Sequence, residues 1–589
     1  MRYKALTGAS PIQFFNLFSH SLIDYTTMNS KPRVLFLLGL ACSGLNAVAQ
    51  TEVVAITVDA EKTIGEMRPI WAWFGYDEPN YTYMKDGRKL LTEIAALSPV
   101  PVYVRTHNLL TSGDGVAALK WGSTNAYTED KKGNPVYSWV IVDSIMDTYL
   151  ERGMKPLVEI GFMPEALSVK PRPYRHSWNT DQPYNNIYTG WSYPPKNYSK
   201  WAELVFQWVR HSIDRYGLEE VKRWKWELWN EPNIKYWQGT FDEYCKLYDY
   251  TADAVKRACP DCSMGGPHTT NPNGESAEKY LRDFLQHCVS GKNYATGRVG
   301  SPIDFIAFHA KGAPKVVDDH VRMNMSPQLD AVATGFGVVA SFPGLKDLPV
   351  IIGECDPEGC AACSMQNHPQ NAYRNGTMYS SYTAASYARI YDLMDQYDIN
   401  LEGAVTWAFE FEGQRWFDGF RDLATNGVDK PVLNVFRMFG MMQGDRIAAD
   451  TPGAITADEI ISSGHRQDSP DIHAIASRDD HSIAIMVWNY HDDSRPAAPS
   501  PVELQVKGIP AGRALLHHYR IDSAHSNSYE TWKRMGSPQD VTAAQYKMLE
   551  ASGQLQLMGS PQWIVCEKGE TKFNLALPRH GVSLFRFSY

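Results

Sequence analysis

Two glutamates, Glu231 and Glu354, are the residues whose setting in the sequence points most directly to chemistry. Glu231 stands in the segment WELWNEPN (226–233) and Glu354 in PVIIGECDPEG (349–359), each at the end of a short apolar run. Two carboxyl groups can share the cleavage of a glycosidic bond, because one protonates the departing oxygen while the other attacks the sugar or activates water. A separation of roughly 5–5.5 Å indicates retention through a covalent intermediate, and roughly 6.5–9.5 Å indicates inversion.

Eight apolar or β-branched runs between residues 70 and 410 provide the elements that could bring the two glutamates together. Helical patterns fill the gaps between them, for example at 201–216 and 241–259. Strands that alternate with helices predict a parallel sheet, and eight such units predict an α/β fold of the closed (β/α)8 TIM-barrel type. The runs are IWAWFGYDE, VPVYVRTHN, KPLVEIGFMP, WKWELWNEP, SMGGPHTT, IDFIAFHAKG, LPVIIGECD and LEGAVTWAFEF.

Polar residues gather at the carboxyl ends of these runs, where a barrel builds its active site. Glu231 ends the fourth run and Glu354 the seventh, so we expect the two to face one another across the barrel mouth. Glu227, four residues before Glu231, is expected to lie deeper and to influence Glu231 or bind an arginine. Glu358 is a rival to Glu354, but it lies beyond Pro357 in a loop.

The residue pattern changes after about residue 440. Segments such as HSIAIMVWNYH and PVELQVKGI alternate between apolar and polar residues, and Gly and Pro separate them. This pattern predicts an accessory antiparallel β-sandwich. We therefore divide the chain into an N-terminal strand that pairs with the sandwich (50–69), a catalytic barrel (70–440) and the sandwich itself (441–589).

The first 49 residues read as a leader. From Met28, which we take as the true start, Lys31 and Arg33 precede an apolar core and a small-residue cleavage site near Ala49-Gln50. This is the pattern of a secretory signal peptide and predicts a secreted or periplasmic protein. A lipoprotein anchor at Cys42 is a weaker alternative. No later stretch is apolar enough to cross a membrane.

Composition narrows the classes of partner. The net charge of −9 and the lack of a long basic run argue against nucleic acid and anionic membrane surfaces. Aromatic residues make up 12% of the chain, which suits both a large core and stacking against sugars. Cys355, Cys360 and Cys363 lack a fourth zinc ligand at a suitable spacing, so a disulfide of open connectivity, or simple burial, is favoured.

The motifs WNEPN and GE, with VRTHNLL, VEIGFMP, FHAKGAP, GECDPEGCAAC, NLEGAVTWAFEFE and RIDSAHSNSYETWKRMGSPQ, give the chain a specific resemblance. It resembles glycoside hydrolase family 39 of clan A, which holds β-xylosidases and α-L-iduronidases, and is most like the secreted bacterial β-xylosidases. The resemblance implies that Glu231 is the acid/base and Glu354 the nucleophile of a retaining enzyme. It also implies that no metal or other cofactor is needed.

Other residues at the strand ends are candidates for substrate binding. Asn230 is expected to bind the sugar 2-hydroxyl. The alternative is a purely structural role as a turn residue before Pro232. Histidines suit sugar hydroxyls, and His309 could in addition contact Glu354. Phe162 and Arg421 are weaker candidates, and Arg421 is as well explained by a structural ion pair. The histidines that end the second, fifth and sixth runs are His107, His268 and His309.

Lys311 and Trp407 bear on the choice of sugar. Trp407 would form an apolar platform below the ring, or else pack in the barrel core. The segment around Lys311 is similar to that of the iduronidases, where the equivalent lysine meets the sugar carboxylate; alternatively Lys311 is solvated or pairs with Glu410 or Glu412.

We therefore predict a retaining exo-glycosidase that removes terminal β-D-xylosyl residues from xylo-oligosaccharides. Another sugar, such as an α-L-arabinoside or a uronide, is the first alternative. An endo-acting hydrolase and a non-catalytic carbohydrate-binding protein are the others.

Overall fold

The computed structural model describes residues 53–589, apart from residues 408–409, 467–468 and 511. The predicted leader, its cleavage site and Cys42 lie outside the described residues. Within the described part of the chain, no helix combines the length and the apolar character that a membrane span requires.

Eight parallel strands form a closed barrel in the order in which they follow one another along the chain. The eighth is interrupted at Val405: β13 (Leu401–Ala404) pairs with the seventh strand and β14 (Thr406–Trp407) with the first, which closes the ring. The predicted TIM barrel is confirmed, and each predicted run supplies one strand. The first seven strands are β2 (Trp73–Tyr76), β3 (Tyr103–Thr106), β6 (Lys155–Ile160), β7 (Lys225–Leu228), β8 (Ser263–Thr269), β9 (Phe305–Lys311) and β12 (Val350–Asp356).

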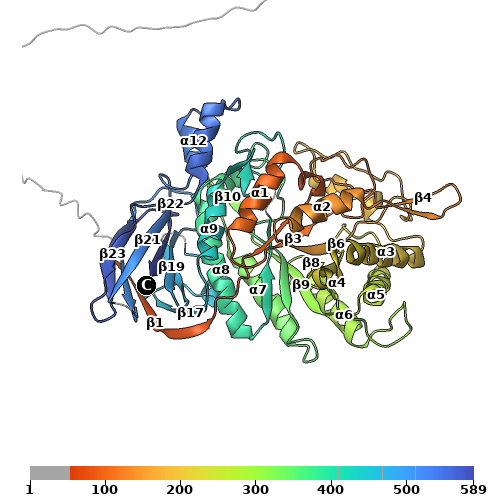
Figure 1. Cartoon of the computed structure of the whole chain (residues 1–589), viewed down its shortest axis with the longest axis horizontal. Helices are drawn as coiled ribbons and strands as arrows, with labels where there is room; N and C mark the ends of the chain where they lie inside the picture. The colour runs from red at the N-terminus through yellow and green to blue at the C-terminus, as the bar shows by residue number, and fades with distance from the viewer. Residues whose placement is uncertain (1–52, 408–409, 467–468, 511) are drawn as a thin grey trace, which may run out of the picture. The chain divides into compact units, whose positions relative to one another are not determined.

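Helices follow the barrel strands and surround them (Figure 1). Their apolar residues face the strands; in the helix at 198–216, for example, Trp201, Val205 and Trp208 are buried at helical spacing. The helices are α1 (Lys85–Ala96), α2 (Val140–Leu150), α3 (Tyr198–Tyr216), α4 (Leu218–Val221), α5 (Phe241–Ala258), α6 (Glu275–Ser290), α7 (Ser326–Ala340), α8 (Thr377–Tyr397) and α9 (Pro431–Gly440).

Short elements occupy the loops of the barrel. They include three small hairpins, β4 (Tyr127–Glu129) with β5 (Pro135–Tyr137), β10 (Lys315–Val317) with β11 (His320–Arg322), and β15 (Ala424–Thr425) with β16 (Val428–Asp429). The 3-10 turns are η1 (Pro79–Tyr81), η2 (Tyr184–Ile187), η3 (Gly190–Ser192) and η4 (Pro369–Asn375).

A second sheet holds the C-terminal strands together with β1 (Val54–Glu66). That strand runs parallel to β20 and antiparallel to β17, so the two ends of the described chain share one sheet. The remaining strands are β17 (Asp445–Asp450), β18 (Asp471–Arg478), β19 (Ser482–Tyr490), β20 (Ser500–Lys507), β21 (Arg513–Ile521), β22 (Gln556–Leu557), β23 (Gln562–Val565), β24 (Thr571–Leu577) and β25 (Val582–Ser588), with helices α10 (Ala457–Ser463), α11 (Ser528–Arg534) and α12 (Ala543–Gly553).

This sheet folds over to enclose its own core. β24 ends the strand order at one side while β25 lies near the other, yet the rings of Phe573 and Phe587 are 5.7 Å apart. Buried and partly exposed residues alternate along β20, as a strand with one face on a core requires. The predicted sandwich architecture is therefore confirmed.

Helix α8 joins the barrel to the sandwich. Most of its residues are buried, because it packs against α7 and α9 of the barrel and against β19 of the sandwich. Tyr382 on α8 lies with its ring 5.9 Å from that of Tyr490, and Arg389 forms a buried ion pair with Asp471 at 2.8 Å. The sandwich thus braces the helix that follows the strand carrying Glu354.

Candidate active site

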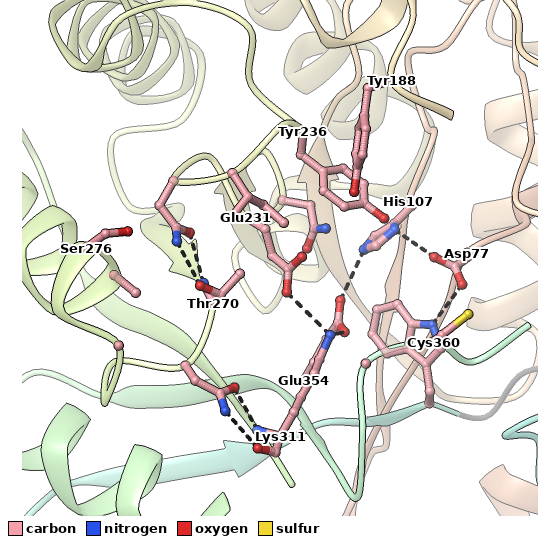
Figure 2. A pocket seen from close by; sticks show the side chains of 18 of the residues that line it. Asp77, His107, Tyr188, Glu231, Tyr236, Thr270, Ser276, Lys311, Glu354 and Cys360 are labelled. Carbon is pink, nitrogen blue, oxygen red and sulfur yellow. Dashed lines mark hydrogen bonds and ion pairs between the residues drawn. The ribbon is translucent and has the colours of Figure 1, made fainter. Parts of the chain in front are cut away.

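A cavity of about 750 Å³ opens at the carboxyl ends of the barrel strands. Figure 2 shows Glu231 and Glu354 in its centre, Thr270 and Ser276 on one side, and Asp77 and His107 on the other. The cavity is lined by Asp77, His107, Lys120, Tyr188, Asn230, Glu231, Asn233, Ile234, Tyr236, Thr270, Asn271, Asn273, Gly274, Glu275, Ser276, Ala277, Lys311, Glu354, Gly359, Cys360 and Trp407.

Glu231 and Glu354 are brought together from β7 and β12. A carboxylate oxygen of each and Nδ1 of His309 all lie within 4.8 Å of one another. The backbone around Glu231 is unusual, with φ of 67° at Trp229 and 42° at Glu231. Such left-handed positions cost energy in non-glycine residues and persist only where neighbours fix them. Here the Glu231 N–H donates to the His268 carbonyl at 2.9 Å, and Trp229 Nε1 donates to the Tyr236 carbonyl at 2.9 Å.

Arg105, in the middle of β3, organises the barrel interior beneath the cavity. Its guanidinium is fully buried and lies 2.6 Å from Glu227, 2.9 Å from Glu159 and 3.3 Å from Glu354. It also donates to the side-chain carbonyl of Asn230 at 3.1 Å. One buried cation therefore holds three carboxyl groups and fixes Asn230 next to Glu231.

Lys311, at the end of β9, lies between the two central carboxylates. Its Nζ is 3.3 Å from Glu231 Oε1 and also contacts Glu354 Oε2. His309 Nδ1 lies 3.0 Å from Glu231 Oε1 and 3.8 Å from Glu354 Oε1. The two oxygens and this nitrogen have the chemistry of ligands to a metal ion, but the Lys311 ammonium already places a positive charge among them.

These neighbours set the charge of both carboxyl groups. Burial alone would raise the pKa of Glu354, but Lys311, His309 and Arg105 hold it well below its usual value. Burial likewise opposes ionisation of Glu231, yet Lys311 and His309 keep its pKa below the usual value. Both groups are thus anions at neutral pH when the cavity contains no substrate.

Asp77, His107, Lys120 and Trp407 build the end of the cavity away from Thr270 and Ser276. Asp77 accepts from Trp407 Nε1 at 3.1 Å, and its carboxylate lies 2.5 Å from Lys120 Nζ and 3.1 Å from His107 Nδ1. Nε2 of the same His107 ring is 3.7 Å from Glu354 Oε1. The imidazole therefore spans the space between Asp77 and Glu354.

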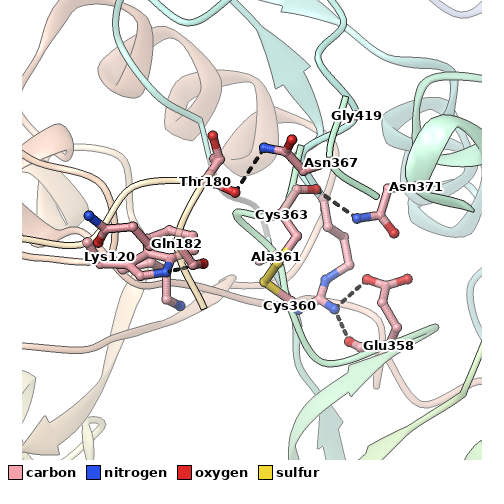
Figure 3. Close-up of a disulfide and its surroundings, with 12 residues drawn as sticks. Lys120, Thr180, Gln182, Glu358, Cys360, Ala361, Cys363, Asn367, Asn371 and Gly419 are labelled. Carbon is pink, nitrogen blue, oxygen red and sulfur yellow. Dashed lines mark hydrogen bonds and ion pairs between the residues drawn. A yellow bond between two sulfur atoms is a disulfide. The ribbon is translucent and has the colours of Figure 1, made fainter. Parts of the chain in front are cut away.

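Two loops meet beside this end of the cavity (Figure 3). Asn367, in the loop after β12, donates to the Thr180 carbonyl and to the Asp181 carboxylate, both at 2.9 Å. A disulfide joins Cys360 to Cys363 in the same loop, and Cys360 reaches the cavity wall. The cavity is thus walled at the Asp77 end, while its opposite end is lined by the start of α6.

The sequence model of the Glycosyl hydrolases family 39 matches residues 54–557. The chain belongs to glycosyl hydrolase family 39. This glycoside hydrolase is 27% identical to a β-xylosidase of Caldicellulosiruptor saccharolyticus over 544 residues, which covers 90% of this chain and 98% of the relative. It is 23% identical to an α-L-iduronidase of Mus musculus over 536 residues, or 84% of this chain and 75% of that protein.

Solved structures show the same fold. A monomeric β-xylosidase from Caulobacter crescentus CB15 matches this glycosidase with a TM-score of 0.69 and 21% identity, over 91% of this chain and 99% of that one. The family 39 enzyme from Xanthomonas axonopodis pv. citri matches with a TM-score of 0.71 and 20% identity, over 92% and 99% of the two chains.

Most residues expected at the site of this glycosidase do line the cavity: Asn230, Glu231, Glu354, His107, Lys311 and Trp407. His268 does not, because it is completely buried beneath the site, where its Nε2 contacts Glu227. The structure thus contradicts the expected contact of His268 with substrate. His309 is also fully buried and touches the carboxylates from below, so a direct contact with sugar is not supported for it either.

The contacts of Lys311, Glu358 and Arg421 distinguish between a position at the site and a structural ion pair. Lys311 pairs with neither Glu410 nor Glu412, whose carboxylates accept from backbone N–H groups elsewhere. Glu358 is not in the cavity wall; Arg374 and Arg421 bind it, each at 2.7 Å. Arg421 therefore forms the structural ion pair that was one of its two explanations.

Phe162 and two of the clustered cysteines have structural positions. Phe162 is buried behind the cavity, with its ring 5.9 Å from that of Tyr236. Of the three clustered cysteines, Cys360 and Cys363 form the disulfide, and Cys355 is a buried free thiol. A second disulfide, Cys259–Cys262, joins the end of α5 to the start of β8 and was not expected.

Five residues that line the cavity or lie beneath it were not predicted from the sequence. Arg105 stood in the predicted second run but looked like an ordinary strand residue, although an arginine inside an apolar strand requires buried partners. Asp77 and Glu159 lay within predicted runs and offered the same signal. Lys120 and Tyr236 come from loops, for which periodicity gives no signal.

Proposed function

We propose that this glycoside hydrolase is a retaining exo-glycosidase that releases terminal β-D-xylosyl residues from xylo-oligosaccharides. The observation that carries the proposal is the pair Glu231 and Glu354, whose carboxylate oxygens approach within 4.8 Å in a cavity walled at one end. Close carboxylates favour a covalent intermediate over the inverting route, which needs room for a water molecule. The wall at the Asp77 end favours attack on chain ends over attack within a chain.

In the first step, an oxygen of Glu354 attacks the anomeric carbon while Glu231 donates a proton to the departing glycosidic oxygen. The C–O bond to the aglycone breaks, and a glycosyl ester of Glu354 forms. In the second step, Glu231 removes a proton from water, which attacks the same carbon and releases Glu354 as a carboxylate. Two inversions give net retention. Asn230, held by Arg105, is placed to bind the sugar 2-hydroxyl.

Glu231 must carry a proton before the first step, yet Lys311 and His309 hold its pKa low in the free enzyme. A sugar that enters between the carboxylates has to separate the Lys311 ammonium from Glu231, and this raises the pKa of Glu231. The negative charge of Glu354 raises it further. Once Glu354 is esterified that charge is lost, so the pKa of Glu231 falls again. Glu231 then remains ionised after it has given up its proton, and its carboxylate is ready to act as a base.

Lys311 supports a second candidate substrate. An ammonium in the cavity wall, largely buried, is suited to a carboxylate, which a uronide has and a xyloside lacks. We keep the xyloside first because the two β-xylosidase relatives are more similar to this chain than the α-L-iduronidases are over comparable lengths.

A panel of 4-nitrophenyl β-xyloside, α-arabinoside, α-iduronide and β-glucuronide decides between these sugars. We expect the highest kcat/KM on the β-xyloside, and a preference for either uronide would overturn that choice. Proton NMR of the first-formed product tests the mechanism independently, because release of β-xylose before mutarotation indicates retention.

Export to the periplasm or the medium is part of the same proposal, since xylo-oligosaccharides are met outside the cytoplasm. It is supported by the leader sequence alone. N-terminal sequencing of the protein purified from its native cell should give a chain that begins at Gln50. A mature chain that begins upstream of Met28 would contradict both the assigned start and the export.

A further inference from the structure

Asp77 and Lys120 form a buried ion pair that the proposed mechanism does not use. Both line the cavity, yet their side chains are only 5% and 6% exposed. Asp77 pairs with Lys120 and with His107. A pair of opposite charges in this position needs a reason, because removing two charges from water is unfavourable.

The position of the pair relative to the scissile bond follows from the two carboxylates. Glu231 protonates the departing oxygen, so the leaving group lies on the side of Thr270 and Ser276, and the terminal sugar lies toward Asp77 (Figure 2). The His107 ring spans from Glu354 at 3.7 Å to Asp77 at 3.1 Å. Asp77 therefore lies about one ring's breadth beyond the nucleophile, where the far edge of a pyranose would stand.

The backbone conformation of Lys120 and its hydrogen bonds hold this residue in place. Its backbone has φ of 56°, a conformation that non-glycine residues seldom adopt. Its N–H donates to the carboxyl group of Glu78, and its carbonyl lies 3.1 Å from His176 Nε2. Asp77 is fixed in turn by Trp407 and His107. Both charged groups are thus presented to the cavity from a rigid support, as specific recognition requires.

Among the described residues, two loops lie beside the pair. Gly359 and Cys360 line the cavity beside it, and the Asn367–Thr180 contact joins the loops next to them. In Figure 3, Lys120 and Gln182 lie beside the Cys360–Cys363 disulfide. The far edge of the terminal sugar therefore meets charged groups of the protein.

We propose that Asp77 and Lys120 are the specificity-determining pair of this enzyme and bind the 3- and 4-hydroxyls of the terminal sugar. A carboxylate accepts from one hydroxyl while the ammonium donates to its neighbour, which is the complement of a vicinal diol. Sugars substituted at these hydroxyls would be rejected. The inference rests on the proposed exo-glycosidase, but not on which pentose or hexose is cleaved.

The test compares variants on matched substrates. Lys120→Met, Asp77→Asn and the double variant are assayed with 4-nitrophenyl β-xyloside and with its 3-deoxy and 4-deoxy analogues. A hydrogen bond to a charged group predicts a loss of roughly 10- to 150-fold in kcat/KM on the parent substrate. On the analogue that lacks the bound hydroxyl, the same variant should lose less than about threefold. Lys235→Met, an exposed lysine outside the cavity wall, is the control.

A purely structural ion pair would give the opposite pattern, with equal losses on the parent and on both deoxy analogues, and that result would overturn the proposal. Because a single variant leaves one buried charge uncompensated, the double variant replaces both by neutral side chains of similar size, and its thermal midpoint is measured alongside. If the wild type cleaves another glycoside of the panel and not the xyloside, the deoxy analogues of that glycoside are used. The proposed sugar would then fail while the role of the pair is still tested.

Discussion

Two charged regions surround Glu354, and they differ in kind. The floor, formed by Arg105, Glu159, Glu227 and His268, is completely buried and its members contact one another. The wall, formed by Lys311, Lys120 and Asp77, reaches the cavity. Floor residues can act only through the groups they hold, which are the carboxylates and the Asn230 amide, whereas wall residues can also meet the sugar. Changes in the floor should therefore affect all substrates alike, and changes in the wall should discriminate among them.

The largest effect is expected at the carboxylate that both regions share. Glu354→Ala removes the nucleophile, and we expect kcat to fall roughly 10⁴- to 10⁶-fold on every substrate. Added azide should restore part of the activity by attacking the anomeric carbon directly. One displacement inverts, so the product should be an α-glycosyl azide. Glu231→Ala is the matched variant, since it keeps the nucleophile and should give the β-azide from an activated aryl glycoside. Identical anomers from both variants would contradict the assigned roles.

The next largest effect should come from the floor. Arg105→Met leaves Glu159, Glu227 and Glu354 without their common cation, and breaking such a buried pair typically costs about 3–5 kcal/mol. The pKa of Glu354 should rise, so the acidic limb of the kcat/KM profile should move to higher pH. Arg389→Met is the control, because it breaks a buried pair with Asp471 outside the cavity. The control should lower the thermal midpoint without moving that limb; movement of the limb in both variants would indicate a general loss of structure.

A smaller and more selective effect is expected in the wall. Lys311→Met removes a positive charge that lowers the pKa of both Glu231 and Glu354, so both pKa values should rise. Ionisation of Glu354 sets the acidic limb and protonation of Glu231 the basic limb, and both limbs should move up by roughly 1–2 pH units. If Lys311 also binds a substrate carboxylate, activity on the uronides should fall further than on the xyloside. An unchanged profile would contradict the contacts with both carboxylates.

The smallest effect should come from His268. Burial lowers the pKa of its imidazole to about 4, so it is neutral throughout the working range. His268→Gln should lower kcat/KM by less than about tenfold and leave both limbs in place. Below pH 6.5 the unfolded chain binds a proton that the folded chain rejects, so this histidine reduces stability as the pH falls from 6.5 toward 4. Urea unfolding at pH 7 and pH 5 should show a smaller acid loss in the variant than in the wild type.

The sequence predicted the barrel, the sandwich and the carboxylate pair because each leaves a regular trace. Apolar runs mark the strands, and a polar residue after each run marks the mouth. The floor left a weaker trace. Charged residues within apolar runs, such as Arg105 and Glu159, require buried partners, but which residues pair depends on strands that are distant in sequence. For His268 the pattern was present but the prediction of a substrate contact was wrong. The residue lies at the end of a strand, as the pattern requires, but the strand shifts its register between Pro267 and Thr269 and the side chain contacts Glu227 beneath the site. Lys120 depends on a loop conformation, which residue types alone do not specify.

Gly353, directly before Glu354, shows how closely the side chains pack beneath the cavity. A Cβ at that position would lie 2.0 Å from His268 Nδ1 and 3.2 Å from His309 Nε2, so no larger residue fits beside the two imidazoles. The strand also shifts its register there, which turns Glu354 toward the cavity. The dipeptide Gly353-Glu354 therefore reflects both the direction of the Glu354 side chain and the packing of imidazoles beneath it. A larger residue in place of Gly353 would therefore have to displace the His268 ring from its contact with Glu227.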